Sequence, residues 1–138
     1  MELIHLEEMD SIKLMNRVDS KFVTTDQMLD RILEMADSRY RVLEVDGATV
    51  ASYDSLYYDT ADLAMYTAHQ NGKLTRQKVR TRTYVSSGDT FLEIKRKNNH
   101  GRTKKKRIRI PLENFENFSA AEGASDFLAE RSWFTAEQ

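Results

Sequence analysis

The chain has 138 residues, which is enough for one modest hydrophobic core and too few for two ordinary domains, so we expect a single domain over residues 1–138. It contains no cysteine, which excludes disulfides, thiolate nucleophiles and thiolate metal sites. The formal net charge is only -1, but residues 73–109 hold 14 Lys and Arg against two acidic residues, while the rest of the chain holds 7 against 20. Such an asymmetry predicts a localised anion site.

The N-terminal segment predicts helix, strand and helix in turn. Residues 1–10 are acidic and lack the features of a signal peptide, and no apolar stretch approaches membrane-spanning length, so we expect a cytoplasmic chain without a membrane segment. Apolar residues at helical spacing predict a short opening helix over residues 6–15, and the alternation in residues 17–23 predicts a strand. Thr24 and Gln27 form a capping-box pattern before a second helix.

The middle of the chain predicts a hairpin followed by a short helix. Residues 40–45 and 49–58 are rich in β-branched and aromatic residues, and they flank Asp46-Gly47, which is typical of a two-residue hairpin turn. Asp59-Thr60 then predicts the start of a short helix.

The second half predicts an antiparallel meander. Three strand-like runs, at residues 75–85, 90–97 and 103–110, are separated by two turn segments rich in Ser, Asn and Gly. Pro111 ends the last run, and the remaining residues read as weakly helical. The expected core residues of that C-terminal segment are Phe115, Phe118, Phe127, Leu128 and Trp133.

Alternation within these three strands sorts the cations onto one face, because residues two apart in a strand point to the same side. The cationic set is Lys78, Arg80, Arg82, Lys95, Lys97, Lys105, Arg107 and Arg109, with Tyr84 and Glu93 among them. The opposite, apolar set is Val79, Val85, Leu92, Ile94, Ile108 and Ile110, and Lys104 and Lys106 share its parity. A charged strand face usually meets water, but solvated faces normally mix signs because like charges opposite each other are destabilising. The crowding of cations therefore favours an anion with several negative oxygens, bound in a concave sheet.

Five segments, in this order along the chain, carry a family resemblance: RVDSKF at 17–22, SLYYDT at 55–60, KVRTRTY at 78–84, FLEIKRK at 91–97 and KKR at 105–107. Together they resemble the VTC (vacuolar transporter chaperone) domain, a polyphosphate polymerase domain of the triphosphate tunnel metalloenzyme superfamily. The resemblance implies an α+β fold in which a CYTH-like antiparallel β-tunnel is flanked by helices.

The same resemblance assigns roles to individual residues. It implies that phosphates are contacted by Lys21, Arg80, Arg82, Lys95, Lys105 and Arg107, with Arg80, Arg82 and Lys95 as the catalytic group. It implies a divalent metal, Mn²⁺ or Mg²⁺, for which Glu93 and Asp19 are the candidate ligands. Glu93 could instead hold Lys95 and the arginines in place, and Asp59-Thr60 would be structural.

Members of the family continue beyond the meander into strands that complete the tunnel and bring the principal metal-binding Glu and a further phosphate-binding Arg. Residues 1–138 would thus form only the N-terminal portion of the tunnel. Three outcomes follow: the chain is a fragment, a second copy supplies the remaining wall, or the sheet works as an open binding surface. An exposed sheet edge would also favour a homo-oligomer.

The resemblance leaves several functions open. In a completed tunnel the chain would act as a polyphosphate polymerase, transferring the terminal phosphoryl group of ATP or another nucleoside triphosphate to polyphosphate. The same site would be a triphosphatase if water were the acceptor, and a non-catalytic polyphosphate or nucleotide binder is the third reading. Nucleic-acid binding ranks lowest, because Tyr84 is the only aromatic residue expected on the cationic side and single-strand binders need stacking platforms.

Overall fold

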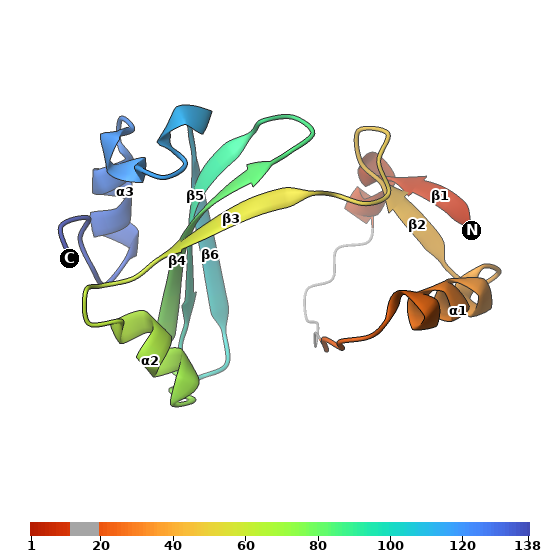
Figure 1. Cartoon of the computed structure of the whole chain (residues 1–138), viewed down its shortest axis with the longest axis horizontal. Coiled ribbons are helices and arrows are strands. Elements are labelled where there is room, and N and C mark those ends of the chain that lie inside the picture. The colour runs from red at the N-terminus through yellow and green to blue at the C-terminus, as the bar shows by residue number, and fades with distance from the viewer. Residues whose placement is uncertain (12–19) are drawn as a thin grey trace. The chain divides into compact units, whose positions relative to one another are not determined.

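The structure, a computed structural model, describes residues 1–11 and 20–138 (Figure 1). The chain divides into two compact units, Met1–Ala51 and Ser52–Gln138, each of which is described by itself. A single functional domain over the whole chain stays a prediction. Within the described residues, no helix combines the length and the apolar character needed to cross a membrane.

The N-terminal unit contains a small parallel sheet and one α-helix. Strand β1 (Glu2–His5) pairs in parallel with β2 (Arg41–Glu44), and a 3-10 helix (Leu6–Ser11) follows β1. The opening helix predicted from residue 6 is thus a 3-10 helix as far as Ser11, and residues 12–15 of that prediction lie outside the described residues.

Helix α1 (Asp26–Ala36) confirms the second predicted helix. Its N-cap is Thr25, one residue later than expected, and the Thr25 hydroxyl accepts a hydrogen bond of 3.3 Å from the Met28 amide. The strand predicted for residues 17–23 is wrong in its described part, because residues 20–23 form no strand. Its first three residues lie outside the described residues.

The hairpin predicted for residues 40–58 is wrong, although its turn is right. Asp46 and Gly47 have positive φ angles of 51° and 77°, as a tight hairpin turn requires, but the turn closes only a single bridge between Val45 and Ala48. Strand β3 (Tyr53–Tyr58) instead makes six consecutive residue pairs with a strand further along the chain. This longer-range pairing provides hydrogen-bond partners for far more backbone N–H and C=O groups than the single local bridge does.

The C-terminal unit is built on a four-stranded antiparallel sheet in the order β3-β4-β5-β6 (Figure 1). Its other strands are β4 (Arg76–Tyr84), β5 (Thr90–Lys97) and β6 (Thr103–Ile110), which confirms the predicted meander. The fold is thus mixed helix and sheet, and the strands of the described residues do not close into a barrel. The expected tunnel stays a prediction.

One face of this sheet carries the hydrophobic core. The 3-10 turn Phe118–Ala120 and helix α3 (Ala124–Arg131) pack against that face, and a further 3-10 turn, Leu112–Asn114, follows β6 without a buried residue. The core residues are Val79, Leu92, Ile94, Ile110, Phe118, Ala121, Ala124, Phe127 and Leu128. Three expected core residues lie outside it, because Val85 and Trp133 are 57% and 48% exposed and Phe115 is only half-buried.

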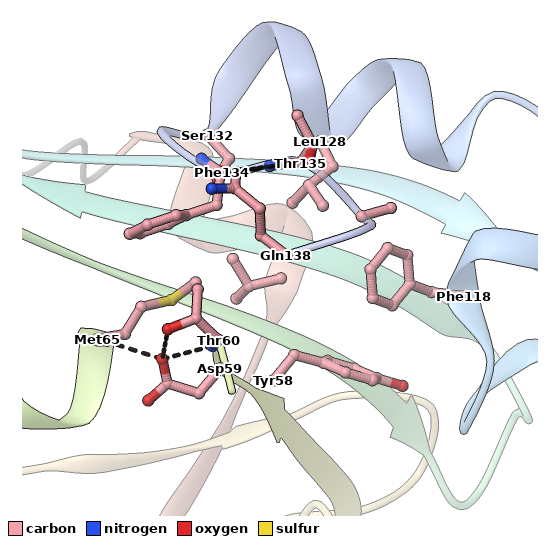
Figure 2. Close-up of a pocket in the computed structure, with 12 residues that line it drawn as sticks. Tyr58, Asp59, Thr60, Met65, Phe118, Leu128, Ser132, Phe134, Thr135 and Gln138 are labelled. Atoms are coloured by element: carbon pink, nitrogen blue, oxygen red, sulfur yellow. Dashed lines mark hydrogen bonds between the residues drawn. The ribbon is translucent and has the colours of Figure 1, made fainter. Parts of the chain in front are cut away.

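A short helix, α2 (Ala64–Gln70), follows β3 and is held by Asp59. The Asp59 carboxylate accepts hydrogen bonds from the backbone amides of Met65 (2.9 Å), Tyr66 (2.8 Å) and Thr60 (2.8 Å), and Figure 2 shows the contacts to Met65 and Thr60. Burial raises the pKa of this carboxyl group, but the three amide donors outweigh burial and hold the pKa below its ordinary value. The Asp59-Thr60 pair therefore has the structural role that was expected of it.

Candidate functional site

The strand register places the predicted cations in rows across the sheet. Lys78 on β4 lies opposite Lys95 on β5, which lies opposite Lys105 on β6. We call these three residues the lysine row. Since directly paired residues point to the same side of a sheet, the row presents three ammonium groups on one face.

The adjacent rows are also cationic. We use the name "cationic face" for the side of the sheet that carries Lys78, Arg80, Arg82, Lys95, Lys97, Lys105, Arg107 and Arg109 together with Glu93. The register confirms that the predicted residues of β4, β5 and β6 share this side, away from α3 and the core. At the end of the sheet nearest the connection between β4 and β5, Arg109 forms an ion pair with Asp89, which belongs to that connection.

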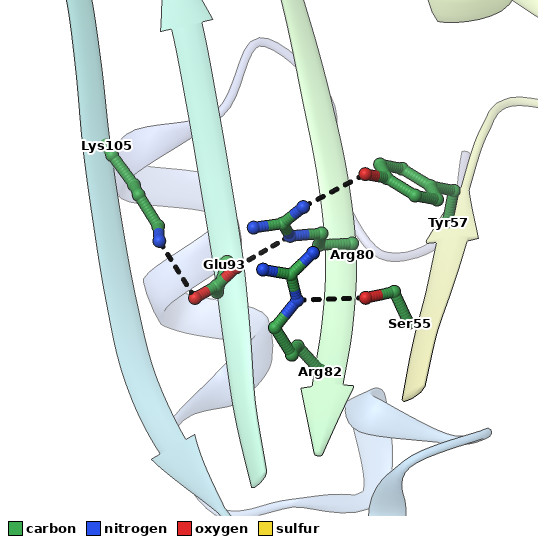
Figure 3. A network of polar contacts seen from close by, with 6 residues as sticks. All are labelled: Ser55, Tyr57, Arg80, Arg82, Glu93 and Lys105. Carbon is green, nitrogen blue, oxygen red and sulfur yellow. Dashed lines mark hydrogen bonds and ion pairs between the residues drawn. The ribbon is translucent and has the colours of Figure 1, made fainter. Parts of the chain in front are cut away.

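At the centre of the cationic face, Glu93 joins three strands (Figure 3). The Arg80 Nε donates a hydrogen bond of 2.6 Å to Glu93 Oε2, and the Lys105 Nζ lies 3.1 Å from Glu93 Oε1. The Glu93 side chain is 2% exposed, whereas those of Arg80 and Lys105 are 20% and 46% exposed. The carboxylate therefore lies beneath a layer of cations and links β4 to β6 across β5.

The cationic partners also determine the protonation of Glu93. Burial raises the pKa of its carboxyl group, but the hydrogen bonds and positive charges of Arg80 and Lys105 outweigh burial and hold the pKa below its ordinary value. The carboxylate is therefore ionised at neutral pH.

This lowered pKa predicts a loss of stability in acid. A carboxyl group whose pKa is lower in the folded than in the unfolded chain contributes stability above the unfolded pKa, and this contribution is lost as the pH falls through the folded pKa. We expect the urea midpoint of the chain to fall across this acid range, and Glu93→Gln to remove part of the pH dependence. An unchanged pH profile in Glu93→Gln would contradict the assignment of this titration to Glu93.

Two residues of β3 that sequence reasoning did not assign to the site orient its arginines. The Arg80 Nη1 donates to the Tyr57 hydroxyl oxygen (2.9 Å), and the Arg82 Nε donates to the Ser55 hydroxyl oxygen (2.9 Å), as Figure 3 shows. Both residues lie within the SLYYDT segment, and their alternation with Leu56 was the signal that could have revealed them.

Aromatic residues on the cationic face are more numerous than predicted. Tyr84 was expected to be the only one, but Tyr53, Tyr57 and Phe91 lie on the same face by register. Their rings already contact cations, because the Arg82 Cζ lies 3.9 Å from the centroid of the Tyr53 ring and the Arg107 Cζ lies 4.2 Å from that of Phe91. These rings therefore support the guanidinium groups.

Tyr57 offers a spectroscopic test of the positive potential. Burial raises the pKa of its phenol, but the hydrogen bond from Arg80 and the charges of Arg80, Lys78 and Arg82 outweigh burial and lower the pKa. An absorbance titration should thus show one tyrosine that ionises below the ordinary range, and Tyr57→Phe should remove it. A bound polyanion should raise this pKa again by neutralising the cations, so a titration insensitive to anions would contradict the prediction.

Two cavities adjoin the lysine row and share Lys78 and His69. One has a volume of about 260 Å³ and is lined by His69, Arg76, Gln77, Lys78, Lys95, Lys97 and Thr103. The other has a volume of about 400 Å³ and is mostly aromatic and apolar, with lining residues from the end of β3 and from α2. The first cavity brings together four cations, Arg76, Lys78, Lys95 and Lys97.

Comparison with known proteins identifies the family. A family model of the VTC domain matches residues 16–134. The chain belongs to the VTC family. Among curated proteins and among solved structures, the comparisons found no match. Membership in the VTC family indicates a role related to polyphosphate and the binding of polyphosphate or triphosphate.

Of the expected site residues, those on β4, β5 and β6 are described as one group, and Lys21 and Asp19 belong to other parts of the chain. Lys21 lies in the N-terminal unit, outside the four-stranded sheet, and its contact with phosphate stays a prediction. Asp19, the second expected metal ligand, lies outside the described residues. Arg80, Arg82, Lys95, Lys105 and Arg107 do share the cationic face, where their roles as phosphate ligands stay predictions.

The described residues of this VTC domain do not fit a metal centre of their own. They contain no group of three or more His, Cys, Asp or Glu side chains close enough to hold an ion. Both oxygens of Glu93 face cations, since Arg80 contacts one and Lys105 the other. Glu93 therefore acts in the structure as the anchor of these cations.

Proposed function

We propose that the cationic face binds the phosphates of a nucleoside triphosphate or of polyphosphate and, in the completed site, transfers a phosphoryl group between them. The lysine row is the observation that carries this proposal. Three paired strands place Lys78, Lys95 and Lys105 directly opposite one another. Like charges so placed are destabilising, so the row is favourable when an anion lies over it.

The charges of the face exceed what its own acids can neutralise. Glu93 is the buried carboxylate of the face, and it is already engaged by Arg80 and Lys105. The Arg82 Nε donates a hydrogen bond to the Ser55 hydroxyl oxygen. The two terminal nitrogens of the same guanidinium group form a planar fork whose geometry suits the oxygens of a phosphate. A chain of phosphates offers several negative oxygens at once, which matches a surface of Arg forks beside Lys point charges.

The proposed reaction needs positioning and charge neutralisation rather than a protein nucleophile. An oxygen of the terminal phosphate of polyphosphate attacks the γ-phosphorus of the nucleoside triphosphate and forms a new P–O–P bond. The bond from the γ-phosphorus to the β–γ bridging oxygen breaks, and the nucleoside diphosphate leaves. Arg80, Arg82 and Lys95 would neutralise the charge that develops on the transferred group.

Calorimetric titration of the full chain with tripolyphosphate tests the binding step. We expect saturable binding that weakens with added salt and is at least as tight as the binding of a single-stranded oligonucleotide of equal charge. Tight oligonucleotide binding without tripolyphosphate binding would overturn the proposal. Chain extension from labelled ATP, measured with and without Mn²⁺ or Mg²⁺, tests the transfer step and includes the metal expected for the family.

A second candidate function is polyphosphate binding without turnover. It is favoured by the open form of the sheet, because β3 and β6 each have a single strand neighbour in the described part of the chain. In that case tripolyphosphate would bind, and neither polyphosphate nor free phosphate would be produced from ATP at any metal concentration. Release of free phosphate without chain growth would instead identify a triphosphatase.

A further inference from the structure

A second cationic cavity lies at the end of the β5–β6 hairpin and borders the cationic face at Lys97. It has a volume of about 190 Å³, and its lining residues are Arg96, Lys97, Asn98, Arg102, Lys104 and Trp133. Four of these six residues are cations and none is a carboxylate. Among the described residues, Arg96, Lys97, Arg102 and Lys104 make no ion pair with an acid. We call this cavity the hairpin-end cavity.

Strand register places this cavity partly on the opposite side of the sheet. Arg96 pairs with Lys104, so both point to the side that carries Ile94 and the core, whereas Lys95 and Lys105 point to the cationic face. The sheet therefore bears cations on both sides at this end. The hydrophobic core does not account for the placement of Arg96 and Lys104, because this residue pair lies beyond Ile94, the last core residue of β5.

Hydrogen bonds to a buried side chain and within the hairpin turn fix the residues that surround the cavity. The amide of Trp133 donates a hydrogen bond of 3.0 Å to the side chain of Gln77, which is buried and also donates to Ser132 (2.9 Å). The guanidinium carbon of Arg96 lies 5.7 Å from the centroid of the Trp133 ring. In the hairpin turn, the Asn98 carboxamide oxygen accepts from the amide of Arg102 (3.0 Å). The cations are thus attached to an ordered frame.

Lys97 connects the two sides, because it lines both the hairpin-end cavity and the 260 Å³ cavity beside the lysine row. Each strand residue advances the chain by about 3.3 Å, so Lys97 lies roughly 7 Å beyond Lys95 along β5. The length of the lysine row and its neighbouring cations on the cationic face suits a ligand as short as a triphosphate. The continuation of cations past Lys97 matches a longer linear polyanion.

We propose that a polyphosphate chain bound on the cationic face continues past Lys97 and binds in the hairpin-end cavity between Arg102, Lys104 and Trp133. This inference rests on the proposed function, because it takes polyphosphate as the ligand of the cationic face. It adds a second contact region for the distal part of the chain. Joining two weak contacts through one ligand raises the overall affinity without strengthening either contact.

The position of Trp133 allows a direct test, because it is the only tryptophan of the chain. With the chain of residues 1–138 we expect medium-chain polyphosphate to change the tryptophan emission and to bind at least about tenfold more tightly than tripolyphosphate, as one added charge-assisted contact would give. The double variant Arg102→Ala/Lys104→Ala should lose this advantage and keep its tripolyphosphate affinity. Both side chains are exposed, so the variant should fold.

The matched control removes two cations from the other unit, in Arg31→Ala/Arg39→Ala, and should retain the long-chain advantage. Equal affinity of wild type for both anions, without a change in Trp133 emission, would overturn the inference and leave the proposed function standing. A larger emission change with a single-stranded oligonucleotide of equal charge would overturn it in favour of a nucleic-acid surface. If Arg80→Ala left tripolyphosphate affinity unchanged, the proposed function itself would fail.

Discussion

Replacing Glu93 by glutamine is expected to lower the free energy of unfolding by about 2 kcal/mol, because it leaves Arg80 and Lys105 without their shared counter-charge. Breaking a fully buried ion pair costs more, but here both cations are partly solvated, so water screens part of the loss. Urea denaturation monitored by Trp133 fluorescence would measure the change. Glu122→Gln, which neutralises an exposed acid of the same unit, is the matched control and should leave the midpoint unchanged.

A ligand effect should accompany this loss. Tripolyphosphate should stabilise Glu93→Gln more than it stabilises the wild-type chain, because the anion then neutralises cations that have lost their carboxylate. The measurement is the shift in melting temperature at increasing tripolyphosphate concentration. Equal shifts in both proteins would show that the anion binds away from Arg80 and Lys105.

The substitution Arg82→Ala is expected to weaken tripolyphosphate binding roughly tenfold to a hundredfold, because a charge-assisted contact contributes about 1.5–3 kcal/mol. Arg82 is suited to this test since its contacts are to Ser55 and to the ring of Tyr53, so its removal leaves no buried acid unpaired. The dissociation constant from calorimetry is the readout. The urea midpoint should change little.

The matched control for Arg82→Ala is Lys73→Ala, which removes one exposed cation just before β4 and off the cationic face. Its tripolyphosphate affinity should stay within about twofold of wild type, since an exposed charge outside the paired strands is screened by salt. If both variants lost affinity to the same degree, binding would depend on net charge alone. The cationic face would then not be the site.

Alternation was sufficient to predict the three strands of the meander and the sides of their residues. In β4 buried residues alternate with half-buried or exposed ones along the whole strand, and in β5 Leu92 and Ile94 alternate with Glu93 and Lys95, so a single register satisfies the core and the charged face together. The cluster of Arg80, Glu93 and Lys105 follows from that register. Its hydrogen bonds do not, because they depend on side-chain rotamers that a pattern leaves open.

Pairing between distant segments was less predictable. Asp46-Gly47 forms the expected turn, but a local turn does not decide which strand its neighbours join, and β3 pairs with β4 instead. Alternation with Leu56 places Ser55 and Tyr57 on one side of a strand, but it does not show that this strand lies beside β4, where they contact the arginines. Phe91 shares the parity of Glu93 and Lys95 on β5, so its side could be predicted from the sequence, whereas the side of Tyr53 follows from the pairing of β3 with β4.

Strand β6 has consequences for how copies of this chain would meet. In the described part of the chain it borders β5 on one side only, and residues 104–107 of this edge are all basic. Two such edges would repel each other if they approached, which is a known protection against unwanted strand addition. The expected oligomer through this edge would therefore need a bridging anion, so self-association should rise with polyphosphate and vanish when the polymer is digested.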